Sequence, residues 1–279
     1  MIGAVDVGGG LRGIYGSAVF DFCLDHNINF DYLIGVSAGS ANVASFLGHQ
    51  KGRNKKFYME YSMRKEYMSP GNFIKLGSYL NLDYIYGTLS NSDGEYPLNF
   101  DMFLKAAARV KIVAANALTG ETKYFEKEDF KRDDYSVCKA SSAIPMVCKP
   151  YVIDGVPYYD GGISDPVPIE QAIRDGCQKV IVILTRPVDF IREQKKDIWP
   201  ARMIKRRFPN AAELLLDRYK KYNDGVARAI QYMKEGRALV LAPDDLCGVE
   251  TLTKDKAKLQ LLYEKGYSDA RKIIDFLKE

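Results

Sequence analysis

The sequence predicts an α/β protein: a three-layer α/β/α sandwich with a mostly parallel central sheet and a helical C-terminal segment. Strand-like and helix-like segments alternate along most of the 279 residues. Several strand segments are apolar throughout, such as KVIVILT at residues 179–185. Strands of this kind are typical of parallel sheets that helices cover on both faces. A hydrophobic content of 47% is sufficient for a sizeable core.

Each expected element follows from a local pattern. Short apolar and β-branched runs between turn signals predict strands, and they cover residues 2–7, 32–36, 111–118, 122–125, 151–153, 156–159, 179–185 and 238–242. The dipeptide Asp154-Gly155 predicts a hairpin between two of them. Apolar residues at helical spacing predict helices, which cover residues 12–25, 38–47, 133–142, 169–176, 209–236 and, as one or two helices, 255–277. Residues 51–99, rich in tyrosine and turn signals, are predicted to be irregular.

The composition limits the class of protein. A net charge of +4 is too small to indicate a nucleic-acid partner. Five cysteines without a C-x-x-C pair favour reduced thiols in the cytoplasm. The N-terminus has no signal-peptide pattern, and no apolar run reaches the roughly 18 residues that span a bilayer. We therefore expect a soluble cytoplasmic protein with one domain over residues 1–279, divided into a core (about 1–187) and a C-terminal helical extension (about 200–279).

A nucleophilic serine is indicated where the apolar run FDYLI (30–34) ends in the motif GVSAG (35–39). Gly-x-Ser-x-Gly between a strand and a helix is typical of a serine on a sharp, strained turn. Glycines at positions 35 and 39 prevent a collision across that turn. Small residues after the serine let the helix pack closely. The sequence thus predicts Ser37 as a nucleophile.

The base that would activate Ser37 is not an obvious histidine. The chain holds only His26 and His49, and neither follows the serine in the order serine, acid, histidine of the familiar hydrolases. The segment YYDGG (158–162) offers a carboxylate instead, because Asp160 follows an apolar strand and precedes two glycines. A buried aspartate with a raised pKa can act as a general base. A simple Asp-Gly turn is the alternative for this segment.

The glycine-rich loop GGGLRG (8–13) lies between the first strand and the first helix. One interpretation is a dinucleotide site, which requires an acidic residue at the end of the second strand. Ser37 follows that strand, however, and the available acid, Asp31, lies at its start. A second interpretation is an oxyanion hole made of uncovered N–H groups. For the loop alone, a tight turn that needs glycine only for its dihedrals explains the pattern equally well.

Taken together and in order, GGGLRG, GVSAG and the Asp-Gly-Gly at 160–162 resemble the patatin-like phospholipases. The run ASSAIP (140–145) also resembles that family's approach to its aspartate, and the resemblance extends over about residues 2–187. It implies a Ser37–Asp160 dyad. It also implies an oxyanion hole built by the loop residues Gly8, Gly9, Gly10 and Arg12. One departure is that Val7, not an acid, directly precedes the glycines and Asp6 lies one place earlier, which we expect to alter the support of the loop but not the chemistry.

The resemblance implies a carboxylic ester hydrolase that cleaves fatty-acyl esters of phospholipids or related lipids through an acyl-enzyme, without a metal or other cofactor. A general carboxylesterase or acyltransferase on smaller esters stays open, as do a lysophospholipase, a dinucleotide-binding protein and a non-catalytic lipid-binding relative. The headgroup, the acyl chain and the oligomeric state are not predicted.

Residues 57–86, rich in Tyr, Met, Phe and Leu, line or cover the acyl site under one hypothesis and form ordinary packing under the other. The segment 199–208 (WPARMIKRRF) is either a solvated basic helix, which we favour, or a transient contact with an anionic membrane surface.

Overall fold

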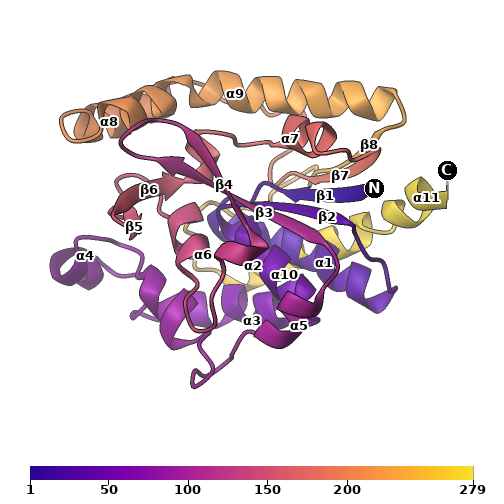
Figure 1. Cartoon of the computed structure of the whole chain (residues 1–279), viewed down its shortest axis with the longest axis horizontal. Coiled ribbons are helices and arrows are strands. Elements are labelled where there is room, and N and C mark those ends of the chain that lie inside the picture. The colour runs from indigo at the N-terminus through magenta and orange to yellow at the C-terminus, as the bar shows by residue number, and fades with distance from the viewer. Residues whose placement is uncertain (279) are drawn as a thin grey trace.

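The computed structural model describes residues 1–278 and arranges them in three layers, a central sheet with helices on both faces (Figure 1). The strand order is β5-β6-β3-β2-β1-β7-β8, with β4 beside β3. Neighbours among β1, β2, β3, β7 and β8 run parallel, whereas β4, β5 and β6 pair antiparallel. The strands are β1 (Ile2–Asp6), β2 (Tyr32–Val36), β3 (Arg109–Asn116), β4 (Thr122–Glu126), β5 (Tyr151–Ile153), β6 (Val156–Asp160), β7 (Lys179–Ile183) and β8 (Ala238–Leu241). The predicted fold class is confirmed.

Helices cover the two faces of the sheet unequally. One face carries α7 (Ile169–Arg174), α8 (Lys195–Ile204) and the long α9 (Pro209–Lys234), which crosses the top of Figure 1. The other face carries α1 (Ile14–Asp25), α2 (Ala38–Leu47), α3 (Arg53–Met59), α5 (Phe100–Lys105), α6 (Ser136–Ser141) and α10 (Lys256–Asp269). The last helix, α11 (Lys272–Lys278), follows α10. The largest apolar cluster lies on this second face, where α1 is buried against α10.

The predicted irregular region, residues 51–99, is wrong in detail because it contains several short helices. Besides α3, these are a 3-10 turn at Tyr61–Met63, α4 (Pro70–Leu76) and a π-helical turn at Tyr84–Thr88. For α4, the Ser-Pro-Gly signal marks a helix start. The Ser69 side chain accepts the N–H of Asn72 as an N-cap, Pro70 takes the first helical position, and Gly77 ends the helix in the left-handed conformation. The same residue types serve turns and caps, so the local signal is ambiguous.

Candidate active site

Ser37 lies on a strained turn between β2 and α2. Its backbone has φ 56° and ψ −128°, a region that costs a non-glycine residue of order 1–3 kcal/mol. The turn is held on both sides: the Ser37 N–H donates to Ser141 Oγ at 2.9 Å, and Ser40 Oγ donates to the Ser37 carbonyl at 2.6 Å. A Cβ on Gly39 would lie 2.4 Å from the Asp6 carbonyl, so only glycine fits there. The surrounding structure therefore fixes Ser37 in a conformation that local preference disfavours.

The pairing of β2 and β6 with β3 brings Asp160 close to Ser37. On one edge of β3, β4 pairs with residues 111–115. On the opposite edge, β2 pairs with residues 109–113 and β6 with residues 114–116. Because β2 runs parallel and β6 antiparallel to β3, the two strands meet end to end on that edge. Ser37 follows the end of β2 and Asp160 is the last residue of β6, so residues 123 positions apart face each other.

Burial raises the pKa of Asp160 above its usual range, and three groups partly offset that effect. These groups are the Ser37 hydroxyl, the positive charge of Arg218 and the Gly162 N–H, which donates to the carboxylate at 2.7 Å. Within residues 1–278 no hydrogen bond of full geometry joins Ser37 Oγ to Asp160. Such pairs are often long until substrate binds. The carboxylate is thus a base of raised proton affinity beside the serine.

The glycine-rich loop packs directly against the serine turn. Gly8, Gly9 and Gly10 all have positive φ, at 63°, 120° and 63°. A Cβ on Gly8 would lie 2.1 Å from the Val36 carbonyl. The Gly8 N–H donates to Asp6 at 2.9 Å, whereas no acceptor within residues 1–278 takes the N–H groups of Gly9 and Gly10. The loop therefore presents two unoccupied backbone donors next to Ser37.

Asp6 and Arg12 support the loop through hydrogen bonds. Asp6 is fully buried and accepts both the Gly8 N–H and the Asn42 side-chain amide, the latter at 2.7 Å. Burial raises the pKa of Asp6 to about 6. Arg12 donates through Nη1 to Thr251 Oγ1 at 2.8 Å, and the Thr251 carbonyl accepts the Leu11 N–H at 2.9 Å. The Arg12 guanidinium thus connects the loop to the segment between β8 and α10.

The two histidines and Asp31 lie away from this site. His26 ends α1 and stacks on Phe22, with ring centroids 3.9 Å apart. His49 is exposed just after α2, at the helix end opposite Ser37. Asp31 accepts the Ile2 N–H at 2.8 Å, at the start of the parallel strands. The acid available for a dinucleotide site therefore lies at the amino ends of the parallel strands, whereas the glycine loop lies at their carboxyl ends.

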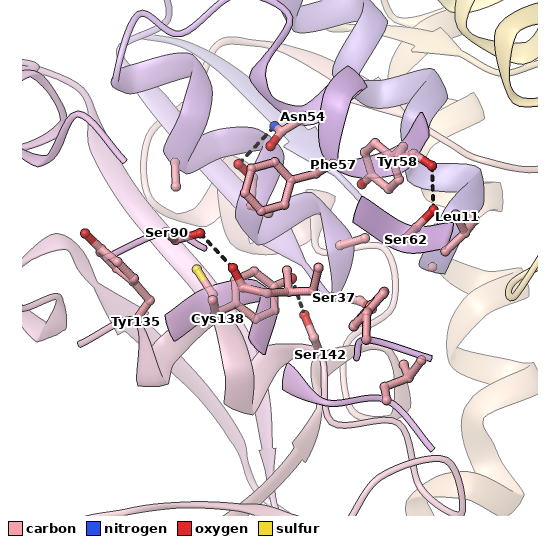
Figure 2. Close-up of a pocket in the computed structure, with 18 of the residues that line it drawn as sticks. Leu11, Ser37, Asn54, Phe57, Tyr58, Ser62, Ser90, Tyr135, Cys138 and Ser142 are labelled. Atoms are coloured by element: carbon pink, nitrogen blue, oxygen red, sulfur yellow. Dashed lines mark hydrogen bonds between the residues drawn. The ribbon is translucent and has the colours of Figure 1, made fainter. Parts of the chain in front are cut away.

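An apolar cavity of about 80 Å³ opens on one side of Ser37 (Figure 2). In Figure 2, Phe57 and Tyr58 come from α3, while Cys138 of α6 and Ser142 just after it lie across the view. Tyr67 and Leu80 also line the cavity, so part of the 57–86 segment forms its wall. Other members do not: Tyr61 lies in a separate buried cluster and Phe73 is exposed on α4. The segment therefore serves both as a cavity wall and as ordinary packing.

A second cavity, of about 270 Å³, also has Ser37 in its lining and is rich in basic side chains. Its lining includes Asp160, Gly8–Gly10 and five basic side chains, namely Arg12, Arg186, Arg192, Lys196 and Arg218. Sequence reasoning identified only Arg12 among these. Arg186 could have been found, because it follows the carboxyl end of parallel strand β7. Arg218 lies on α9 and carries no local signal.

Residues 7–173 match the sequence model of a family described as patatin-like phospholipase, and residues 208–279 match a domain of unknown function, DUF6363. The chain is 33% identical over 201 residues to the uncharacterized protein YjjU of Escherichia coli K12, covering 67% of this chain and 52% of that protein. It therefore spans about half the length of that relative. The crystal structure of VipD from Legionella pneumophila aligns with 98% of this chain and 66% of its own, at a TM-score of 0.49 and 13% identity.

Proposed function

The chain belongs to the patatin-like phospholipase family, and from this premise we propose a serine acyl hydrolase that cleaves fatty-acyl esters of phospholipids or related lipids. The observation that carries the proposal is the end-to-end meeting of β2 and β6, which puts a strained serine opposite a buried aspartate. In the proposed dyad, Ser37 is the nucleophile and Asp160 is the base. No histidine takes part.

The proposed reaction has two acyl-transfer steps. Asp160 accepts the proton of Ser37 Oγ while this oxygen attacks the ester carbonyl carbon. The tetrahedral intermediate collapses, the alcohol leaves with the proton from Asp160, and the acyl group remains on Ser37. Asp160 then takes a proton from water, the hydroxyl attacks the acyl-enzyme, and Ser37 Oγ leaves and recovers its proton as the fatty acid departs. Asp160 accepts and returns the proton in both steps. A raised pKa suits this role, because a general base works best when its pKa lies near the working pH.

The negative charge that develops on the carbonyl oxygen needs donors that are already in place. We assign this role to the N–H groups of Gly9 and Gly10, which are free in the described part of the chain. One such donor is worth roughly 3 kcal/mol in the transition state. Gly8 and Arg12 support the loop in this scheme, because the Gly8 N–H donates to Asp6 and Arg12 Nη1 donates to Thr251. Since Thr251 lies in the C-terminal part, the whole of residues 1–279 would act as one catalytic unit.

A second candidate is hydrolysis of smaller esters. The apolar cavity of about 80 Å³ is smaller than the ~150 Å³ cavity that accommodates benzene in an engineered protein core. A long acyl chain would therefore require the aromatic lining to move or the chain to leave through the mouth of the cavity. Rates on a series of esters that differ only in acyl length separate the two candidates.

A transient contact with a membrane surface is part of the proposal. α8 exposes Trp199 (60%) and Met203 (55%) among basic residues, and α4 exposes Ile74 (87%). Both helices lie at the left of Figure 1, at the end of the molecule that carries β5 and β6. Apolar side chains flanked by cations are typical of segments that enter an anionic lipid interface. No helix within residues 1–278 is long and apolar enough to span a bilayer.

Labelling with a fluorophosphonate probe tests the nucleophile. We expect wild type to be labelled, Ser37→Ala to be unlabelled, and the exposed control Ser268→Ala on α10 to be labelled like wild type. Asp160→Asn should lose turnover of a neutral ester while keeping its circular dichroism spectrum. Unchanged labelling of Ser37→Ala, or wild-type turnover by Asp160→Asn, refutes the corresponding assignment.

A further inference from the structure

The apolar cavity and the cationic cavity meet at the proposed nucleophile. Ser37, Gly10 and Ile144 line both of them. A molecule whose ester carbonyl lies at Ser37 is therefore next to both an apolar space and a charged space. This matches the two ends of an amphiphilic ester, with the acyl chain in one cavity and the alcohol part in the other.

Tyr222 lines the cationic cavity together with four arginines. The positive charges of Arg12, Arg186, Arg192 and Arg218 each lower the pKa of the buried Tyr222, although burial raises it overall. The arginines come from four separate elements: the glycine loop, the segment after β7, the segment before α8, and α9. Lys196, at the start of α8, adds a fifth cation at the exposed rim.

Acidic side chains neutralise only part of this charge. Asp197 makes a bidentate pair with Arg192 at 2.7–3.0 Å and lies 3.8 Å from Arg218. Glu250, itself mostly exposed, lies 3.7 Å from Arg12. Within residues 1–278, Arg186 has no carboxylate at ion-pair distance and instead stacks on Phe190, with its guanidinium carbon 4.3 Å from the ring centroid.

Two further observations indicate that this cavity suits an anion. Arg12 is 6% exposed, yet its Nε has no hydrogen-bond partner in the described part of the chain. Burial, together with repulsion from neighbouring arginines, lowers the pKa of Arg12 and of Arg218 to about 10. Uncompensated buried charge of one sign is costly, so such clusters are typical of sites that bind the opposite charge.

We propose that this cavity, built by Arg12, Arg186, Arg192, Lys196 and Arg218, binds the phosphate group of the lipid substrate while its ester is held at Ser37. The proposal rests on the hydrolase function and names its substrate class: acyl esters with an anionic phosphate headgroup, phosphate monoesters above all. Arginine forks match phosphate oxygens in pairs, which gives orientation as well as affinity. A headgroup with a quaternary ammonium would put a cation among five others.

Selectivity between two lysolipids tests the proposal. The substrates share one acyl chain, and one carries glycerol phosphate whereas the other carries glycerol alone. We expect wild type to favour the phosphate ester in kcat/KM, and Arg186→Gln to reduce that ratio about 10- to 100-fold, as expected for a lost charge-assisted hydrogen bond. Lys196→Gln, on the exposed rim, gives a second reading if Arg186→Gln does not fold. Arg271→Gln, an exposed site between α10 and α11 with the same charge change outside both cavities, should keep the wild-type ratio.

Inorganic phosphate distinguishes a headgroup site from a site for the free ion. We expect phosphate to raise the melting temperature of wild type and Ser37→Ala more than that of Arg186→Gln at equal ionic strength. This measurement needs no turnover, so it tests the phosphate site even if neither lysolipid is hydrolysed. A failure to hydrolyse either lysolipid would refute only the hydrolase function. Phosphate stabilisation with an unchanged selectivity ratio in Arg186→Gln overturns the headgroup assignment. No effect in either assay overturns the site altogether.

Discussion

Gly8 is the point where the glycine loop touches the serine turn, so Gly8→Ala tests whether that contact matters. Gly8 has φ +63° and lies so close to the turn that an added Cβ would meet the Val36 carbonyl oxygen at 2.1 Å. The same Cβ would lie 2.9 Å from the Ala38 nitrogen. The substitution therefore adds one methyl group at the joint between the proposed oxyanion donors and the proposed nucleophile.

The magnitude follows from two terms. A left-handed backbone costs a non-glycine residue roughly 1–2 kcal/mol. Overpacking of a filled site costs roughly 1–3 kcal/mol more. We therefore expect the free energy of unfolding to fall by about 2–5 kcal/mol. The methyl group must also move from 2.1 Å to at least 3.0 Å from the Val36 oxygen, a shift of about 0.9 Å. A misplacement of about 1 Å at a reacting centre can lower kcat about 100-fold.

Urea denaturation and steady-state hydrolysis of a neutral ester measure both effects. Gly155→Ala is the matched control, because Gly155 has φ +79° in the β5–β6 hairpin but nothing within 4 Å of its added Cβ. The control should lose only about 1–2 kcal/mol and keep its kcat. If Gly8→Ala is no less stable than Gly155→Ala and its kcat stays within about threefold of wild type, the loop and the turn are not coupled in the way described.

Three further changes have defined outcomes. Burial raises the pKa of Asp6 to about 6, above its unfolded value, so its ionisation disfavours the folded state; urea denaturation should show wild-type stability rising by about 1.4 kcal/mol as pH falls from 8 to 5, with that increment missing in Asp6→Asn. Phe57→Ala enlarges the apolar cavity and should shift kcat/KM towards longer acyl esters; an unchanged chain-length series contradicts the acyl-site assignment. Trp199→Ala should slow hydrolysis of lipid in anionic vesicles but not of a soluble ester, and equal loss on both substrates argues against membrane contact.

Much of the fold could be predicted from the sequence because its strands are apolar and its longer helices have regular apolar faces. Residues 32–36 and 38–47 form β2 and α2 with the predicted bounds. The region 51–99 could not be assigned, since its helices are about two turns or shorter and depend on caps and on tertiary packing. Local patterns in such a region indicate where the chain turns but not whether a helix follows.

The residues of the candidate site also divide into those that sequence motifs indicate and those that only tertiary packing brings there. The glycine loop, Ser37 and Asp160 have motifs, and the structure brings these segments together. Ser141, which accepts the Ser37 N–H, lies 104 residues along the chain, and Thr251, which holds Arg12, is 239 residues away. Neither residue type has a pattern that points to such a role. Only the packing of β3 against β2 and β6, and of the β8–α10 segment against the loop, brings them to the site.

The pH profile of ester hydrolysis gives the last test, because in the proposed dyad Asp160 must be ionised to accept the Ser37 proton. Burial raises the pKa of Asp160 and the charge of Arg218 lowers it, so kcat/KM for a neutral ester should fall as pH falls through a value above about 4, the ordinary aspartate pKa. The neighbouring Cys148 does not interfere, since burial raises its pKa to about 12. Arg218 also donates through Nε to the Gly162 carbonyl at 2.7 Å, which makes it a positioning residue as well as a charge.

Two variants of Arg218 separate its charge from its hydrogen bond. Arg218→Met removes both, so the acidic limb of kcat/KM should move to higher pH as Asp160 loses its cation. Arg218→Lys keeps the charge without the planar fork, so we expect a lower kcat and a smaller movement of that limb. If both variants lower kcat but leave the acidic limb at the same pH, the role of Arg218 is only to hold the Gly162 carbonyl. Another group would then have to lower the pKa of the buried Asp160 enough for it to be ionised near neutral pH.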